Sequence, residues 1–167
     1  MAYQRLIICN TSPLINLAET DLLDLLGALL GTVCIPPAVQ EELRAKVGLF
    51  PKATQAADSG RFAILTPADN LLVRGLSATL HRGEAECLAL AMENPDSLLV
   101  LDDLSARTVA SANGLPFTGT LGILAAAKAR GYLAALAPVL RQLRSHARFW
   151  ISTQLEQDIL AEAGEIQ

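Results

Sequence analysis

Two adjacent carboxylates behind a short apolar run are the residues best placed to do chemistry. Asp102 and Asp103 come directly after residues 98–101, which are four bulky apolar residues. Such a run is typical of a buried strand, and charges at its end emerge at the C-terminal edge of the sheet, where open α/β sheets bind ligands. Neighbouring acids repel one another unless a cation lies between them. The pair therefore indicates a site for a hard divalent metal such as Mg²⁺.

Two glutamates in expected helices can join this site. At about 100° per residue, Glu42 falls on the flank of the apolar stripe of its helix and Glu84 falls within the stripe of its own. The same helical phase turns Glu41 and Glu86 away from those stripes. An inward acid on an apolar face requires a partner, and a bound cation would supply one. The alternative for Glu84 is an acid near a helix N-terminus that the helix dipole favours and that has no function.

Polar residues also follow the first expected strand. Asn10 ends that strand, and Ser12 precedes a helix that begins at Leu14; either polar residue could simply cap the helix. Because the first strand of a doubly wound sheet is usually central, we expect Asn10 to lie beside the end of the 98–101 strand. Because side chains alternate along a strand, one of Asp102 and Asp103 should face the site and the other can cap the next helix. We expect Asp103 to be the one that lies closer to the metal.

A segment rich in glycine and threonine follows the last expected strand. Residues 118–122 read Thr-Gly-Thr-Leu-Gly, and the glycines allow close backbone approach to a ligand. An ordinary turn with Thr120 as a helix N-cap would have the same sequence.

The elements that position these residues alternate regularly. Strand-like runs cover residues 6–9, 32–35, 62–65, 98–101 and 115–118, and helical patterns separate them. This alternation predicts repeated βαβ units and an α/β fold with a mostly parallel sheet of about five strands. A chain of 167 residues, 51% of them hydrophobic, is long enough for one well-buried core. We expect one domain over residues 1–148 and a C-terminal appendage, residues 149–167, packed on it.

Composition excludes several protein classes. Only 18% of the residues are charged, which argues against disorder. Cys9, Cys34 and Cys87 show neither disulfide nor zinc-site spacing and are expected to be buried thiols in a reducing compartment. Neither a secretion signal nor an apolar run of about 20 residues occurs, so a soluble, cytoplasmic protein without a membrane partner is expected. No glycine-rich dinucleotide or P-loop motif follows the first strand.

The charges are unevenly distributed along the chain. The net charge is -4, yet residues 104–155 contain no acid. A basic surface beside an acidic, metal-binding edge would suit a phosphodiester polymer, although solvated helix faces would give the same composition. The basic residues of this stretch are Arg107, Lys128, Arg130, Arg141, Arg144 and Arg148.

An ordered set of sequence blocks resembles the PIN-domain superfamily of metal-dependent ribonucleases, and within it a bacterial group similar to the toxins of toxin-antitoxin pairs. The blocks are residues 10–15 (NTSPLI), 35–39 (IPPAV) leading to 41–43 (EEL), 83–91 (GEAECLALA), 101–103 (LDD) with Arg107, and 119–122 (GTLG). Each block is loose by itself. Their order along nearly the whole chain makes the set specific.

The resemblance implies a three-layer α/β/α PIN fold in which an acidic cluster holds Mg²⁺ or Mn²⁺. The metal would activate a water that attacks the RNA phosphodiester, leaving 5'-phosphate and 3'-hydroxyl ends. The resemblance also implies a homodimer and an antitoxin partner that blocks the site. On this basis the catalytic positions are Asn10, Glu42, Glu84, Asp102 and Asp103, with Asn10, Glu84, Asp102 and Asp103 as metal ligands. The substrate-binding positions are Ser12, Arg107, Thr118 and Thr120.

Asn10 departs from the aspartate that is usual in the superfamily. An amide oxygen can ligate Mg²⁺, but it brings no charge and cannot act as a base. The sequence therefore supports two functions from different classes: a metal-dependent ribonuclease, and a PIN-like module of weak or no activity that binds RNA or a protein partner. A phosphoacceptor or phosphatase domain ranks third, because such folds place an aspartate where this chain has Asn10, Thr11 and Ser12.

Overall fold

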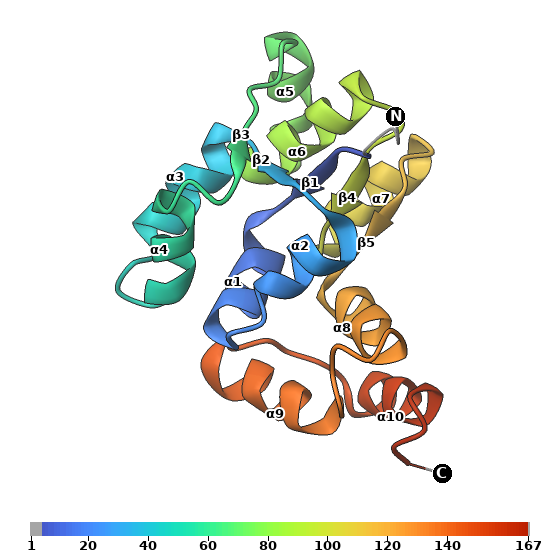
Figure 1. The fold of residues 1–167 in the computed structure, drawn as a ribbon. Coiled ribbons are helices and arrows are strands. Elements are labelled where there is room, and N and C mark those ends of the chain that lie inside the picture. Colours follow the sequence, from blue (N-terminus) through green and yellow to red (C-terminus); the bar gives the residue numbers. More distant parts are fainter. Residues whose placement is uncertain (1–4, 167) are drawn as a thin grey trace.

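The computed structural model of the chain describes residues 5–166 and contains a central parallel sheet (Figure 1). Its strand order is β3-β2-β1-β4-β5, and every neighbouring pair is parallel. The predicted α/β class and all five predicted strands are confirmed, each strand being one or two residues shorter than its apolar run. The strands are β1 (Ile7–Cys9), β2 (Val33–Ile35), β3 (Ala63–Ile64), β4 (Leu98–Val100) and β5 (Phe117–Thr118).

Helices cover both faces of this sheet. α6 packs against β1 and β4, whereas α2 packs against β2 and contacts α8. The chain leaves β1 toward β2 and leaves β4 toward β5, on opposite sides of the sheet. Because crossovers between parallel strands are right-handed as a rule, these two groups of helices form the outer layers of a three-layer α/β/α fold. The helices are α1 (Thr11–Glu19), α2 (Asp24–Leu30), α3 (Pro37–Ala45), α4 (Pro51–Asp58), α5 (Asn70–Leu76), α6 (Arg82–Glu93), α7 (Leu104–Ala112), α8 (Thr120–Ala129), α9 (Ala137–His146) and α10 (Thr153–Glu162).

The core lies where the strands are apolar on both faces. Ile8, Leu99 and Val100 are completely buried, as expected of parallel strands that are covered by helices on each side. The three cysteines are buried free thiols, as predicted. The C-terminal α10 joins the same core, because Leu160 is buried and Ile159 and Ala163 pack against it. Within residues 5–166 no helix is both long and apolar enough to cross a membrane.

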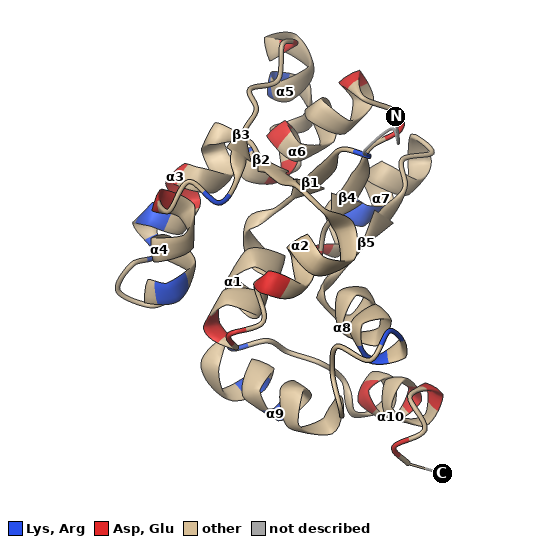
Figure 2. Ribbon diagram, in the orientation of Figure 1, with Lys and Arg blue, Asp and Glu red and all other residues tan. Residues whose placement is uncertain are grey.

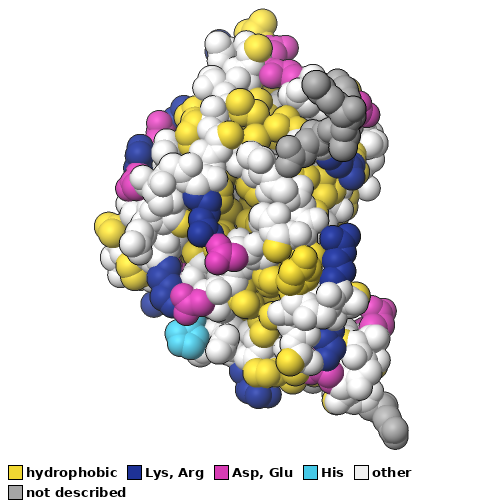
Figure 3. Space-filling view, viewed as in Figure 1, with side chains coloured by type: hydrophobic (Ala, Val, Ile, Leu, Met, Phe, Trp, Pro, Cys, Tyr) yellow, Lys and Arg dark blue, Asp and Glu magenta, His cyan; other side chains and the backbone are white. Residues whose placement is uncertain are grey.

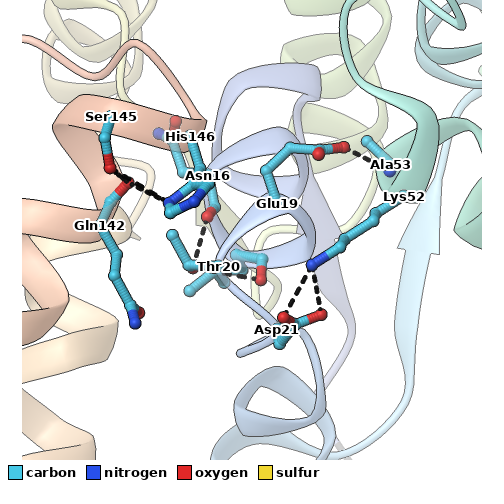
Figure 4. A network of polar contacts seen from close by, with 10 residues as sticks. Asn16, Glu19, Thr20, Asp21, Lys52, Ala53, Gln142, Ser145 and His146 are labelled. Atoms are coloured by element: carbon cyan, nitrogen blue, oxygen red, sulfur yellow. Dashed lines mark hydrogen bonds and ion pairs between the residues drawn. The ribbon is translucent and has the colours of Figure 1, made fainter.

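Helix α1 is fixed by polar contacts at its C-terminal end (Figure 4). The carboxylate of Glu19 accepts a hydrogen bond of 3.0 Å from Ala53 N in the first turn of α4, and Lys52 forms an ion pair of 2.7 Å with Asp21. Thr20 Oγ1 donates to the carbonyl of Asn16 at 2.7 Å. The first two contacts join the end of α1 to the start of α4, and the third is local to the end of α1. Asn16 of α1 donates to Asp102 at the edge of the sheet.

Candidate functional site

The C-terminal ends of β1 and β4 form the switch point of the sheet. The connections of these two neighbouring strands run to opposite sides, which leaves a crevice at the edge where ligands bind in open α/β sheets. Asn10 directly follows β1, and its backbone N–H donates to Val100 O at 3.1 Å. The prediction that Asn10 lies beside the end of the 98–101 strand is confirmed, and Asp102 and Asp103 follow β4 at the same edge.

Asp102 is held by an internal hydrogen-bond network. Its Oδ1 accepts from Thr120 N at 2.8 Å, and its Oδ2 accepts from Thr120 Oγ1 at 2.6 Å and from Asn16 Nδ2 at 2.9 Å. The guanidinium of Arg107 lies 3.8 Å from Oδ1 and is itself fixed by the carbonyl of Leu101. Both carboxylate oxygens of Asp102 therefore have protein partners. The side chain ties β4 to α1 and to the start of α8.

Sequence reasoning missed Asn16, although a signal for it was present. Asn16 is a polar residue in a helix where all its immediate neighbours along the chain are buried and apolar. A polar group buried on an apolar helix requires a hydrogen-bond partner, and here Asn16 finds Asp102 and Thr120.

Asp103 caps a helix and also faces the site. Its Oδ1 accepts from Ala106 N at 2.9 Å, so Asp103 is the N-cap of α7. We expected one aspartate to face the site and the other to cap the helix, with Asp103 closer to the metal. In the structure Asp103 has both positions, since it caps α7 and also lines the site. Asp103 is exposed and lines a cavity of about 540 Å³ together with Ser12, Glu84 and Asp102. We call this cavity the acidic cleft.

Glu84 is a buried acid among other acids. It lies in the first turn of α6, its side chain accepts from His81 N at 3.0 Å, and only 8% of the residue is exposed. Burial raises the pKa of the Glu84 carboxyl, and the negative charges of Asp103 and Glu42 raise it further, while the hydrogen bond from His81 opposes the shift. Glu84 is thus an inward acid, as its helical phase predicted, and a positive charge beside it would stabilise its ionised form.

Glu42 connects three elements around Glu84. Its carboxylate accepts from the hydroxyl of Thr11 at the start of α1 and from Gly83 N at the start of α6, the latter at 3.1 Å. A Cβ atom on residue 83 would lie 2.6 Å from Glu42 Oε1. Glycine at position 83 is therefore what allows the carboxylate to reach the helix backbone, a role that sequence reasoning did not assign to it.

The prediction for Glu86 is wrong, whereas that for Glu41 holds. Glu86 is buried, its carboxylate accepts from Ala38 N at 2.9 Å in the first turn of α3, and Arg82 donates to it at 3.0 Å. The helical phase placed Glu86 far from the apolar stripe of α6, but α3 packs over that side of the helix as well. Glu41 is exposed and pairs with Arg82 at 3.1 Å.

Asn10 carries an unpaired polar atom into this region. The residue is 4% exposed, and its Oδ1 is buried without a hydrogen-bond partner in the part of the chain that the structure describes. A buried acceptor without a partner costs about 1–3 kcal/mol. Asn10 lines a cavity of about 350 Å³ together with Glu42 and Glu84, which we call the Asn10 pocket.

The predicted substrate-binding residues separate into two groups. Ser12 is exposed and lines both the acidic cleft and the Asn10 pocket. Thr120 is fully buried against Asp102, Arg107 lies 5.6 Å from the ring centroid of Phe117, and Thr118 lines a different cavity of about 560 Å³. Only Ser12 of the four residues therefore lines the acidic cleft. Thr120 is buried, and Arg107 lines the same cavity as Thr118.

Acidic residues pair with some of the basic residues of the acid-free stretch. Figure 2 shows acidic residues on α10 near the basic residues of α8, and Figure 3 shows the two signs interspersed over one face. Lys128 pairs with Glu165 at 3.5 Å, and Arg144 pairs with Glu156 at 2.5 Å. Of the predicted set, Arg148 lines the acidic cleft, where Lys46 and His81, which sequence reasoning missed, also lie.

The site offers oxygen donors of the kind that a hard cation prefers. Within residues 5–166 no three side chains of His, Cys, Asp or Glu converge closely enough to enclose a metal ion by themselves. Mg²⁺, however, is bound in proteins through one or two carboxylates, with water and substrate oxygens completing the shell. The unpartnered Asn10 Oδ1 and the buried Glu84 carboxylate, beside Asp103, fit that chemistry.

Comparison with known proteins agrees with this geometry. The model of a PIN-domain family matches residues 6–165, which include every strand and every residue of the site. No curated protein and no solved structure matches the chain. PIN domains have a nuclease-type fold with a sheet and flanking helices of the kind seen here. From the family match and the parallel five-stranded sheet together, we conclude that this chain belongs to the PIN-domain family.

Proposed function

We propose that the protein is a metal-dependent ribonuclease that hydrolyses RNA phosphodiester bonds and acts as the toxin of a toxin-antitoxin pair. One observation carries the proposal: the buried Oδ1 of Asn10 has no partner among the described residues, and Asn10 is a lining residue of a pocket that Glu42 and Glu84 also line. A structural amide would be expected to find a hydrogen-bond partner. An unpaired acceptor on a residue that shares a pocket with two acids suits a site whose missing partner is a cation.

Each residue of the site has a distinct role in this proposal. Glu84, Asp103 and Asn10 would hold Mg²⁺ or Mn²⁺, and Glu42 would orient water from its fixed position between Thr11 and Gly83. When bound, the cation lowers the pKa of water and offsets the negative charge that develops on the phosphate. Asp102 positions the edge of the sheet through Thr120 and Asn16.

The proposal is tested with purified protein and labelled single-stranded RNA. Cleavage should require Mg²⁺ or Mn²⁺ and should stop with EDTA. Glu84→Gln keeps the shape of the side chain but removes its charge, so we expect a loss of rate of about 100-fold, which is typical when a preorganised charge is removed from a reaction centre. Glu41→Gln is the matched control, because Glu41 is an exposed acid on α3 whose only ion-pair partner within residues 5–166 is Arg82. Cleavage by Glu84→Gln at the parental rate would contradict the assignment.

The toxin role, the antitoxin and the homodimer rest on the resemblance of the sequence blocks. If the protein is a toxin, its induced expression should arrest bacterial growth, and Glu84→Gln should relieve that arrest at equal protein level. Sedimentation of the purified protein measures whether it dimerises.

A second candidate function is a PIN-like module that binds RNA or a protein without cleaving RNA. Two observations favour it: Asn10 stands where an acid is usual, and both oxygens of Asp102 are bound by other side chains or backbone. Isothermal titration that detects no Mg²⁺ or Mn²⁺ binding at millimolar concentration, together with tight RNA or partner binding, would support this function over the nuclease.

A further inference from the structure

The only tryptophan of the chain stands at the rim of the acidic cleft. Trp150 is 82% exposed, although tryptophan is on average a strongly buried residue. It lines the acidic cleft, and it also lines the neighbouring cavity of about 560 Å³ beside β5 and α10. Phe149 and Asp102 are shared by the two cavities in the same way. Trp150 thus lies at the boundary between the acidic cleft and this second cavity.

The backbone around Trp150 is held from both sides. Residues 147–152 cross the molecule from the end of α9 to the start of α10 (Figure 1). Ala147 and Ile151 are buried, Phe149 N donates to Leu143 O at 3.1 Å, and Arg144 donates to Ile151 O at 3.3 Å. The exposed indole is therefore presented by an anchored segment.

Two cations lie at the same rim. Arg148 and Lys46 both line the acidic cleft, and neither forms an ion pair within residues 5–166. Arg148 has a backbone φ of 56°, a left-handed conformation that is uncommon for residues other than glycine. The strained backbone directs a charged residue into the cleft next to Trp150. A nucleic-acid phosphate would find its counter-charge there, beside acids that otherwise repel it.

We infer that Trp150 is a stacking platform for one base of single-stranded RNA, with Arg148 binding a phosphate of the same strand, at the entrance to the acidic cleft. Aromatic side chains bind single strands in this way because an unpaired base exposes its ring face, whereas bases in a duplex are covered by their neighbours. The inference rests on the proposed function for its substrate class. It adds the residue that would hold the strand beside the acids.

The test uses the tryptophan as its own probe, in EDTA, so that no RNA is cleaved. A short oligouridylate should quench the fluorescence of Trp150 in a saturable way. An abasic ribose-phosphate strand of equal length should leave most of the fluorescence intensity unchanged. By anisotropy with labelled oligouridylate, Trp150→Ala should raise Kd at least about fivefold, since stacking on one aromatic residue typically contributes that much or more. Trp150→Phe should retain most of the affinity. Tyr132→Ala, which removes an exposed aromatic residue that lines neither cavity, is the control.

The outcomes separate this inference from the proposed function. Equal quenching by the abasic strand, or an unchanged Kd for Trp150→Ala, overturns the stacking role even if the enzyme cleaves RNA. Base-dependent quenching supports it even if no cleavage is found with Mn²⁺. If the emission of Trp150 instead shifts with protein concentration and Trp150→Ala yields a smaller species in sedimentation, the residue belongs to an interface between two copies, and the stacking role is refuted.

Discussion

Replacing Asp102 by alanine should destabilise the protein far more than replacing Asp103. Asp102→Ala removes the acceptor of three hydrogen bonds, of 2.6, 2.8 and 2.9 Å, from Thr120 Oγ1, Thr120 N and Asn16 Nδ2. Thr120 is completely buried and Asn16 is 4% exposed, so little water reaches these donors. Asp103→Ala removes one hydrogen bond, from Ala106 N, at an exposed helix cap.

The expected magnitudes follow from these contacts. A buried donor left without an acceptor costs about 1–3 kcal/mol, and three donors in one network are less than additive, so Asp102→Ala should lower the free energy of unfolding by about 3–5 kcal/mol. The partly exposed Arg107, 3.8 Å away, adds little. Loss of an N-cap costs about 1 kcal/mol, which is the value expected for Asp103→Ala.

Urea denaturation measures both variants, provided that the m value stays constant. A double-mutant cycle adds a sharper test: Asn16→Ala should cost less in the Asp102→Ala background than in the parent, because the shared hydrogen bond is already lost. If Asp102→Ala destabilises the protein no more than Asp103→Ala, Asp102 does not anchor the edge of the sheet. The positioning role that the site assigns to it would then be refuted.

Three further perturbations address other parts of the molecule. Gly83→Ala should leave the free energy of unfolding within about 1 kcal/mol of the parent, because the gain in helix propensity offsets the displacement of the Glu42 carboxylate by the new Cβ. The rate of RNA cleavage should nevertheless fall at least about tenfold. Gly75→Ala is the control and should cleave RNA at the parental rate, because a Cβ at that position meets no atom within 4 Å. Backbone hydrogen bonds at the start of α9 lower the pKa of Glu165 below its ordinary value of 4.5, so this carboxylate stabilises the fold above pH 4.5, and that contribution is lost as the pH falls through the folded-state pKa. Thermal unfolding of Glu165→Gln should show lower stability at neutral pH and a flatter decline in acid, and parallel pH profiles for variant and parent would contradict this. Arg148→Asn places a residue that tolerates the left-handed backbone at this position. The slope of log Kd against log salt concentration should then fall by about 0.7, because one phosphate contact is lost. An unchanged slope would show that Arg148 contacts no phosphate.

The sheet could be predicted from the sequence because its strands are continuous apolar runs separated by helical patterns. Every residue of the runs 6–9 and 98–101 is apolar, and a polar residue directly follows each run. Continuous apolar runs are typical of parallel strands that are buried on both faces. The position of Asn10 beside β4 followed from the same reasoning, since the first strand of such a sheet is central. What these patterns do not contain is the distance between side chains from different elements.

The hydrogen-bond partners were therefore beyond sequence reasoning. Asp102 and Asp103 are chemically identical neighbours, and only the packing of α1 and α8 around β4 assigns one to a network and the other to a cap. Arg107 was expected at the substrate because it belongs to the sequence blocks that resemble the PIN-domain superfamily. The fold instead turns it toward the carbonyl of Leu101, where it supports the loop that carries the aspartates.

The two buried acids of α6 show which property separates a site residue from a structural one. Helical phase distinguished Glu84 from Glu86 by the direction of the apolar stripe, yet both side chains are buried. Glu86 has a backbone N–H of α3 and the guanidinium of Arg82 as partners, so its charge is compensated within the protein. Burial raises the pKa of the Glu84 carboxyl, two nearby acids raise it further, and its single backbone hydrogen bond only opposes the shift. An acid that remains uncompensated after folding is the one that a cation would stabilise most, which is why Glu84 rather than Glu86 is the residue on which the nuclease proposal should be tested.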